Sequence, residues 1–290
     1  MKKLFLPILI LLIVSSCSLK KKSTFEYDFI ITPSKSEQSK GTILLIHGSA
    51  PLNIDARIPV ENDKSIFSRL TLYKDLAEAL NKLGWDVARY GKYGVFKDRI
   101  DYEILKEVDF KLSLEQLQHV WQRIPRDRPF IVFAASGGTV LAPHLSLDEA
   151  DALIMLGAVS KTIKDVFIDR FDEEEGKEEE RKRIISAYKM KRDEMFNKEW
   201  SAGKAVDIFN LADNWTFFEK YKDLPMLVLH GEDDKAVKVY QSKIWKDKLP
   251  KHDVTLMTKP KGNHLYGIGK SFDMNELAVV MDRWLEAKLK

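Results

Sequence analysis

The sequence predicts an α/β protein with a mostly parallel central β-sheet flanked by helices. Two observations support this class. Short apolar runs alternate with helical patterns from Thr42 onward, which is typical of repeated βαβ units. In addition, 44% of the 290 residues are hydrophobic, enough to fill the core of one large domain or two small ones.

The expected strands are continuous apolar runs, as strands covered by helices on both faces must be. The first run, residues 42–48, reads TILLIHG. The following strands are expected at residues 85–90, 129–136, 150–159, 225–231 and 253–260. Before them, residues 25–32 (FEYDFIIT) predict an additional strand at the edge of the sheet.

Segments with apolar residues at helical spacing separate these strands. Residues 73–85 show this pattern around Gly84, a residue suited to ending a helix. Further helices are expected at residues 111–124, 138–145, 239–249 and 274–289.

Residues 160–223 interrupt the alternation with a highly charged stretch that has no strand pattern. Glutamates 178 and 179 precede Lys182 and Arg183 by four residues, the spacing of ion pairs on a solvated helix. Aromatic residues follow that suggest packing on an apolar surface: Trp200, Phe209, Trp215, Phe217, Phe218 and Tyr221. We expect a helical cap at 160–223, inserted between two parts of the core, 25–159 and 224–290.

The N-terminus combines Lys2 and Lys3 with an apolar run from Leu4 to Val14, too short to span a bilayer. The run ends in VSSC with Cys17, the only cysteine. This pattern resembles the lipobox of bacterial lipoproteins, which implies a signal peptide at residues 1–16 and a lipidated Cys17. Two or more acyl chains would anchor the protein stably in a membrane. An ordinary secretory signal and an apolar start of a cytosolic protein are the alternatives.

Residues 17–24 then form a short lysine-rich tether, or a plain solvated linker. The lipoprotein pattern implies a place in the bacterial cell envelope. Ser18 follows the cysteine and carries no inner-membrane retention signal, so the outer membrane is favoured if the host is Gram-negative.

Composition argues against several other kinds of partner. The net charge is +3, and the lysines are scattered among acidic residues, so we expect no nucleic-acid partner. With a single cysteine and no cluster of His, Asp or Glu, no metal site and no disulfide framework are expected. No pattern calls for a cofactor, and the oligomeric state stays open.

A serine at a strand-to-helix corner is the first candidate for chemistry. In FIVFAASGGTV, residues 130–140, a strand runs directly into Ser136, which two glycines follow. A nucleophile elbow needs small neighbours because the serine backbone is strained and the next helix passes close to the strand. The usual motif is G-x-S-x-G, and Ala134 replaces its first glycine. An incidental turn is the alternative.

Two further strand ends carry a candidate acid and a candidate base. In LHGEDDKAV, Asp234 is favoured over Asp233 as a carboxylate that could hold a histidine. In KGNHLYG, His264 lies in a glycine-flanked loop late in the chain. Two other histidines, His47 and His230, precede glycines at strand ends and are expected to shape loops instead.

The order Ser136, Asp234, His264 along the chain is the order that α/β-hydrolases use. From about Phe25 to Lys290 the chain resembles the α/β-hydrolase superfamily, with LLIHGSAP, FAASGGT, LHGEDDKAV and GNHLYG matching its four functional loops. The stretch IHGSAPLNID is most similar to an esterase-like bacterial branch that writes H-G-S-G-P, with Ala50 in place of the glycine.

This resemblance implies an α/β-hydrolase fold and a Ser136–His264–Asp234 triad that cleaves a small acyl substrate, most simply an ester. It also implies an oxyanion hole formed by the backbone N–H groups of Ser49 and Gly137. A peptidase, lipase, thioesterase or acyltransferase could use the same triad. Serine as the nucleophile argues against dehalogenases and dienelactone hydrolases.

Two rival interpretations are weaker. SAGK, residues 201–204, fits the S-x-x-K motif of penicillin-interacting enzymes, but no S-D-N or K-T-G accompanies it. A membrane-tethered scaffold with an inactive hydrolase fold is the rival from another class, although all three triad positions are intact.

The lipobox makes a prediction that can be checked in cells. Cells fed radiolabelled palmitate should incorporate label into the wild-type chain, because its cysteine thiol is the site of acylation. A Cys17→Ser variant should carry none. Label that persists on the variant would rule out this anchor.

Overall fold

The computed structural model describes residues 26–59, 69–172, 178–179, 182, 212–269 and 271–289. Within these ranges, seven strands form one sheet in the order β1-β3-β2-β4-β5-β6-β7. All neighbouring strands are parallel except β1 and β3, which are antiparallel. The predicted fold class is confirmed, and so is the edge position of the first strand.

The strands are short and, in the centre of the sheet, fully buried. Their bounds are β1 Phe29–Thr32, β2 Thr42–Ile46, β3 Asp86–Tyr90, β4 Phe130–Ala135, β5 Ala152–Leu156, β6 Met226–Gly231 and β7 Val254–Lys259. Every residue of β2, β4, β5 and β6 is buried, which explains why these strands appear in the sequence as unbroken apolar runs.

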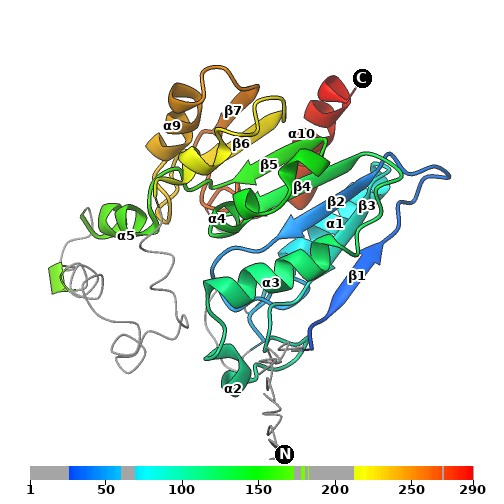
Figure 1. Ribbon diagram of the computed structural model, residues 1–290, viewed down its shortest axis with the longest axis horizontal. Helices are drawn as coiled ribbons and strands as arrows, with labels where there is room; N and C mark the ends of the chain where they lie inside the picture. The colour runs from blue at the N-terminus through cyan, green and yellow to red at the C-terminus, as the bar shows by residue number, and fades with distance from the viewer. Residues whose placement is uncertain are drawn as a thin grey trace, which may run out of the picture.

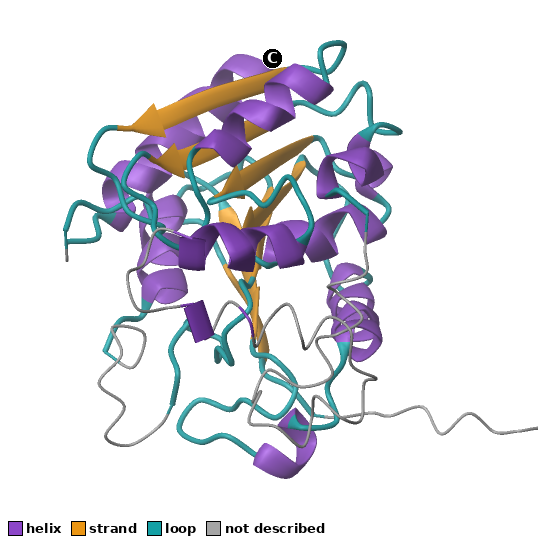
Figure 2. Ribbon diagram, turned by 90° about the vertical axis from the view of Figure 1, so that its left-hand side faces the viewer, coloured by secondary structure: helices purple, strands orange, loops and turns teal. Residues whose placement is uncertain are grey.

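Helices cover both faces of this sheet (Figures 1 and 2). In Figure 1, α3 lies in front of the sheet, and α1 and α10 lie behind it. The helical bounds are α1 Leu72–Lys82, α2 Tyr102–Leu105, α3 Phe110–Trp121, α4 Gly138–Leu141, α5 Ile163–Asp172, α9 Tyr240–Lys248 and α10 Met274–Lys288. Short 3₁₀ segments are η2 Ala142–His144, η3 Leu147–Glu149 and η4 Asn214–Phe218.

The core therefore has two layers, one on each face of the sheet. Alternate residues of one strand enter different layers: Ile43 and Leu45 pack with α1 and α10, whereas Leu44 and Ile46 pack with α3 and α9. Both layers are fully buried at these positions. Because helices pack on both faces, each strand is fixed in position along the sheet. The loops that follow the strands are thereby fixed as well.

The helix after Ser136 is shorter than predicted. The sequence predicts one helix over residues 138–145, but α4 ends at Leu141 and a 3₁₀ turn, η2, replaces its second half. Pro143 lies in this turn, and proline has no backbone N–H to continue an α-helical ladder.

The insertion returns to the core well before residue 224. Its helix α5 is described, as is an ion pair of 2.7 Å between Lys182 and Glu179, three residues apart rather than the four expected. Phe218 and Tyr221 are buried beside Trp245 in the layer of α3 and α9. Most of the predicted cap, including Trp200, Phe209 and the SAGK segment, lies outside the described residues, as does Arg183.

The predicted signal peptide, Cys17 and the tether also lie outside the described residues. In the part of the chain that is described, none of the helices has the length and apolar character needed to cross a bilayer.

Asn214 connects η4, where the insertion returns to the core, with residues that follow β4 and β5. Its buried amide nitrogen donates to the carbonyl oxygens of Thr139 (3.0 Å) and Val159 (2.7 Å), which follow β4 and β5. The side chain thus joins η4 to the first turn of α4 and to the loop after β5.

Replacing Asn214 by Ala should lower the free energy of unfolding by about 1–3 kcal/mol, because two buried carbonyl groups lose their donor. Urea denaturation followed by circular dichroism would measure this loss. Asn275→Ala, on an exposed position of α10, is the matched control and should stay within about 0.5 kcal/mol of the wild type. Equal effects of the two changes would contradict the proposed connection.

Candidate active site

Ser136 occupies the corner between β4 and α4 in a strained conformation. Its φ is +51°, in the left-handed region that residues other than glycine rarely adopt. This conformation costs about 1–2 kcal/mol and persists only where the surroundings impose it. Here the N–H of Ser136 donates to the carbonyl of Leu156 (2.8 Å), and Thr139 donates twice to the Ser136 carbonyl, from its N–H and from its hydroxyl. The corner is held by the strand beside it and by the first turn of α4.

The register of the sheet brings three strand ends into one row. Ala135 of β4 pairs with Leu156 of β5, and Leu156 pairs with Leu229 of β6. The residues that follow, Ser136, Gly157 and His230, are therefore neighbours across the same edge.

His264 reaches this row from the loop after β7. A Cβ at Gly157 would lie 2.8 Å from Cε1 of His264 and 2.9 Å from Nδ1, so the imidazole rests directly on the glycine backbone. Gly157 also has a φ of +56°, which a side chain would strain. Ser136 and the His264 ring are therefore both neighbours of Gly157.

Asp234 holds His264 by a direct hydrogen bond. Nδ1 of the ring is 2.7 Å from Oδ2 of the carboxylate, and the other oxygen, Oδ1, accepts the N–H groups of Ala236 (2.8 Å) and Val237 (2.9 Å). Asp234 is almost completely buried, whereas Asp233 is exposed. Of the two adjacent acids, the structure brings Asp234 to His264.

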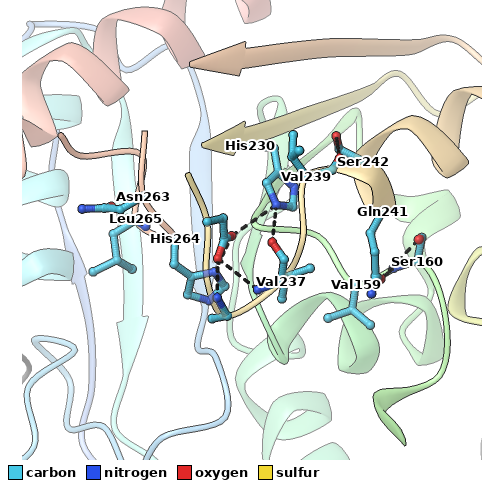
Figure 3. A network of polar contacts seen from close by, with 12 residues as sticks. Val159, Ser160, His230, Val237, Val239, Gln241, Ser242, Asn263, His264 and Leu265 are labelled. Carbon is cyan, nitrogen blue, oxygen red and sulfur yellow. Dashed lines mark hydrogen bonds and ion pairs between the residues drawn. The ribbon is translucent and has the colours of Figure 1, made fainter. Parts of the chain in front are cut away.

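His230 contacts the same carboxylate from the opposite side. Figure 3 shows the two histidines converging on one acid, with His230 Nε2 3.2 Å from Oδ2 of Asp234 and 2.8 Å from the Val237 carbonyl. Both neighbours are acceptors, so Nε2 of His230 carries a hydrogen. The sequence analysis missed this role and assigned His230 to loop shaping. The four-residue spacing from His230 to Asp234 is the signal that could have revealed it.

These donors decide the charge of Asp234. Burial alone raises the pKa of the carboxyl group, but hydrogen bonds from His230, His264 and the Val237 N–H outweigh burial and hold the pKa well below its usual range. The carboxylate is therefore ionised and accepts a hydrogen bond from the Nδ1–H of His264. That tautomer leaves Nε2 of His264 with a free lone pair on the other side of the ring.

Two backbone N–H groups lie close together beside Ser136. A Cβ at Gly137 would lie 3.1 Å from the backbone nitrogen of Ser49 and 2.2 Å from its hydroxyl, so the loop after β2 touches the start of α4. Within the described part of the chain, neither the N–H of Ser49 nor that of Gly137 is used in a hydrogen bond. The two N–H groups therefore lie near each other at the start of α4, with no partner among the described residues.

One contact of the expected triad is not formed. Among the described residues, no hydrogen bond joins the hydroxyl of Ser136 to His264. Catalytic hydrogen bonds are often long or misaligned until substrate is bound.

A cavity of about 450 Å³ borders the other side of the acid. Its lining is charged and includes Asp169, Glu232, Asp234 and Lys238, but neither Ser136 nor His264. It does not reach the serine. Across the described residues, no group of three or more metal-ligating side chains is close enough to hold an ion.

Comparison with known proteins agrees with this architecture. A model of the prolyl oligopeptidase family matches residues 185–290, which include Asp234 and His264 but not Ser136. No curated protein sequence gives a significant match.

Three solved structures illustrate the similarity in shape. Est1E from Butyrivibrio proteoclasticus, with ferulic acid bound, shares 16% identity at a TM-score of 0.59, over 92% of this chain and 97% of that one. A monoglyceride lipase from Saccharomyces cerevisiae shares 15% at 0.62, over 91% and 92%. A thermophilic esterase from Thermogutta terrifontis shares 15% at 0.53, over 92% and 95%.

The chain has the α/β-hydrolase fold. At these identities the structural likeness establishes the fold alone.

The electrostatics of Asp234 predict a pH-dependent contribution to stability. Its pKa in the folded protein is below the unfolded value of about 4, so the ionised group stabilises the fold above that pH and this contribution is lost as the pH falls through the folded pKa. In an Asp234→Asn variant the free energy of unfolding at pH 7 should fall by about 1.5–3 kcal/mol, because a charged hydrogen-bond acceptor is lost.

Urea unfolding at a series of pH values would measure the difference between the variant and the wild type. The difference should shrink below about pH 4. Asp233→Asn, at the exposed neighbour, should show no such trend. A constant difference down to the acid limit would contradict the assigned ionisation of Asp234.

Proposed function

We propose that the protein is a serine hydrolase that cleaves an ester bond through Ser136, His264 and Asp234. The single observation that carries this proposal is the convergence on Gly157 of a serine at positive φ and a histidine bonded to a buried carboxylate. A hydroxyl at a strained corner, a base next to it and an acid that orients the base are the parts that nucleophilic acyl transfer requires.

The reaction would begin with proton transfer from Ser136 to Nε2 of His264 as Oγ attacks the substrate carbonyl. Asp234 stabilises the positive charge that the imidazole gains. The carbonyl oxygen becomes an anion and accepts hydrogen bonds from the N–H groups of Ser49 and Gly137. His264 then passes its proton to the leaving alcohol, which departs and leaves an acyl group on Ser136. Water, activated by the same histidine, releases the acid.

Small or medium acyl esters are the proposed substrates, entering beneath the 160–223 segment. Among the structural neighbours, Est1E has ferulic acid bound, and the monoglyceride lipase is in complex with a substrate analogue. These compounds are ligands of those proteins, and they support the choice of ester panels for this chain.

A peptidase is the second candidate, because the family that matches residues 185–290 is the prolyl oligopeptidase family. That match covers only the acid and the histidine, which esterases and peptidases share. Comparing ester substrates with prolyl amides of the same leaving group would separate the two activities.

The proposed location is the bacterial cell envelope, through a lipid on Cys17. The support for it is the lipobox pattern alone. The tether would keep the hydrolase close to the membrane surface and bring it near substrates that partition into lipid.

The first test is chemical labelling of the nucleophile. A fluorophosphonate probe should label the wild-type chain, and Ser136→Ala should abolish both labelling and hydrolysis of a p-nitrophenyl ester. Ser146→Ala, at an exposed serine nearby in the sequence, should retain both. No labelling of the wild type would favour the inactive scaffold, and full activity of Ser136→Ala would show the site to be misassigned.

The second test distinguishes the two acids by rate. Asp234→Asn should reduce kcat by up to about 10⁴-fold, because the amide cannot hold the tautomer of His264 that accepts a proton. Asp233→Asn should leave kcat within about twofold, because its side chain is exposed. A larger loss at residue 233 would reverse the assignment.

A further inference from the structure

A lysine from the loop after β3 contacts the loop that carries Ser49. The ammonium of Lys92 donates a hydrogen bond to the backbone carbonyl of Gly48, and its backbone N–H donates to the carbonyl of Leu52 (3.2 Å). The loop after β3 is thereby joined at two points to the loop after β2. Neither contact takes part in the triad.

The contacted carbonyl belongs to the same peptide unit as the N–H of Ser49. In a trans peptide the C=O and N–H bonds point in opposite directions, and the unit is planar. When Lys92 holds the oxygen of Gly48 on one side, the N–H of Ser49 must face the other side. Gly137 lies next to this peptide, since a Cβ on Gly137 would be 3.1 Å from the backbone nitrogen of Ser49.

We propose that Lys92 is a positioning residue for the oxyanion hole of Ser49 and Gly137, and that its ammonium directs and polarises the Ser49 N–H through the carbonyl of Gly48. This inference rests on the proposed function, because an oxyanion forms there only if Ser136 attacks a carbonyl. Lys92 itself does not touch the reacting atoms.

The charge of Lys92 strengthens this contact. A hydrogen bond from an ionised donor is about twice as strong as one between neutral groups, and it draws electron density toward the oxygen, which makes the N–H of the same peptide a better donor. The described residues place no carboxylate within ion-pair distance of Lys92, and burial lowers its pKa to about 7. Both protonation states are therefore accessible near neutral pH.

The charged groups around Lys92 leave it free for this role. Arg89 on β3 pairs with Asp55 at 2.6 Å, so its charge is already compensated. His47 stacks on Tyr73 and bonds the Tyr90 carbonyl. Burial, followed by the charge of Lys92, lowers the pKa of His47 to about 3, so this ring stays neutral where Lys92 titrates.

Kinetics with three variants test the functional part. Lys92→Met keeps the length of the side chain and removes the donor, and its kcat on a p-nitrophenyl ester should fall about 10- to 100-fold, a part of the effect of deleting an oxyanion donor. KM should change less than about threefold, because the substrate's ground state makes little use of this N–H. Lys92→Arg should recover most of kcat, and Lys97→Met, at an exposed lysine five residues on, should match the wild type.

The pH dependence separates positioning by charge from a purely structural role. The kcat of the wild type should decline as the pH rises through the pKa of Lys92. The Lys92→Arg variant should lack this decline, since the guanidinium of arginine stays protonated up to about pH 12. The proposal would be overturned if Lys92→Met and Lys92→Arg lost kcat equally and both kept the decline of kcat at high pH. An unchanged kcat in Lys92→Met would also overturn it.

A second measurement does not depend on activity. Gly48 is the only glycine in the chain that precedes a serine, so labelling with 13C-carbonyl glycine and 15N-serine gives one HNCO signal, that of the Gly48–Ser49 peptide. In the full chain this signal should shift with pH as Lys92 titrates, and the shift should vanish in both Lys92→Met and Lys92→Arg. A wild-type titration no larger than that of Lys92→Met would refute the contact. If the wild type hydrolyses no ester and takes no probe, the proposed function fails, while this titration still decides whether Lys92 controls the peptide.

Discussion

The register of the parallel sheet is the constraint on which the rest of the site depends. Because β4, β5 and β6 are paired in step, Ser136 and Gly157, the first residues beyond β4 and β5, lie beside His230 near the end of β6. A shift of one strand by one residue would turn its side chains to the opposite faces of the sheet, and two fully buried core layers oppose such a shift. The core therefore determines the geometry at its edge with a precision that loops alone could not supply.

The site also concentrates unfavourable features that the surrounding structure compensates. Ser136 is held at a positive φ, and Asp234 is an ionised group removed from water. The acid is compensated by two backbone N–H groups and two imidazoles, and the serine by its bonds to β5 and to Thr139. Such compensation keeps the acid charged and holds Ser136 at the corner beyond β4.

Much of this arrangement could be predicted because it follows from local patterns. Unbroken apolar runs revealed the central strands, and small residues beside Ser136 indicated the corner. Prediction was less accurate where local pattern and context compete. Helical spacing continued to residue 145, but Pro143 turned the second half of the expected helix into a 3₁₀ segment. The aromatic residues of the insertion predicted packing on an apolar surface, and Phe218 is indeed buried. No local pattern indicated the role of Asn214, because its hydrogen bonds depend on partners far away in the sequence.

The sequence by itself determined the fold class, the order of the candidate triad residues and the preference for Asp234 over Asp233, because these depend on periodicity and on motifs a few residues long. Only the tertiary structure decided that His230 shares the carboxylate, that Gly157 supports the imidazole and that Lys92 bonds the peptide before Ser49. Each of these contacts joins loops from different strands. Their distances are set by how the strands pack, and no local pattern in the chain encodes that packing.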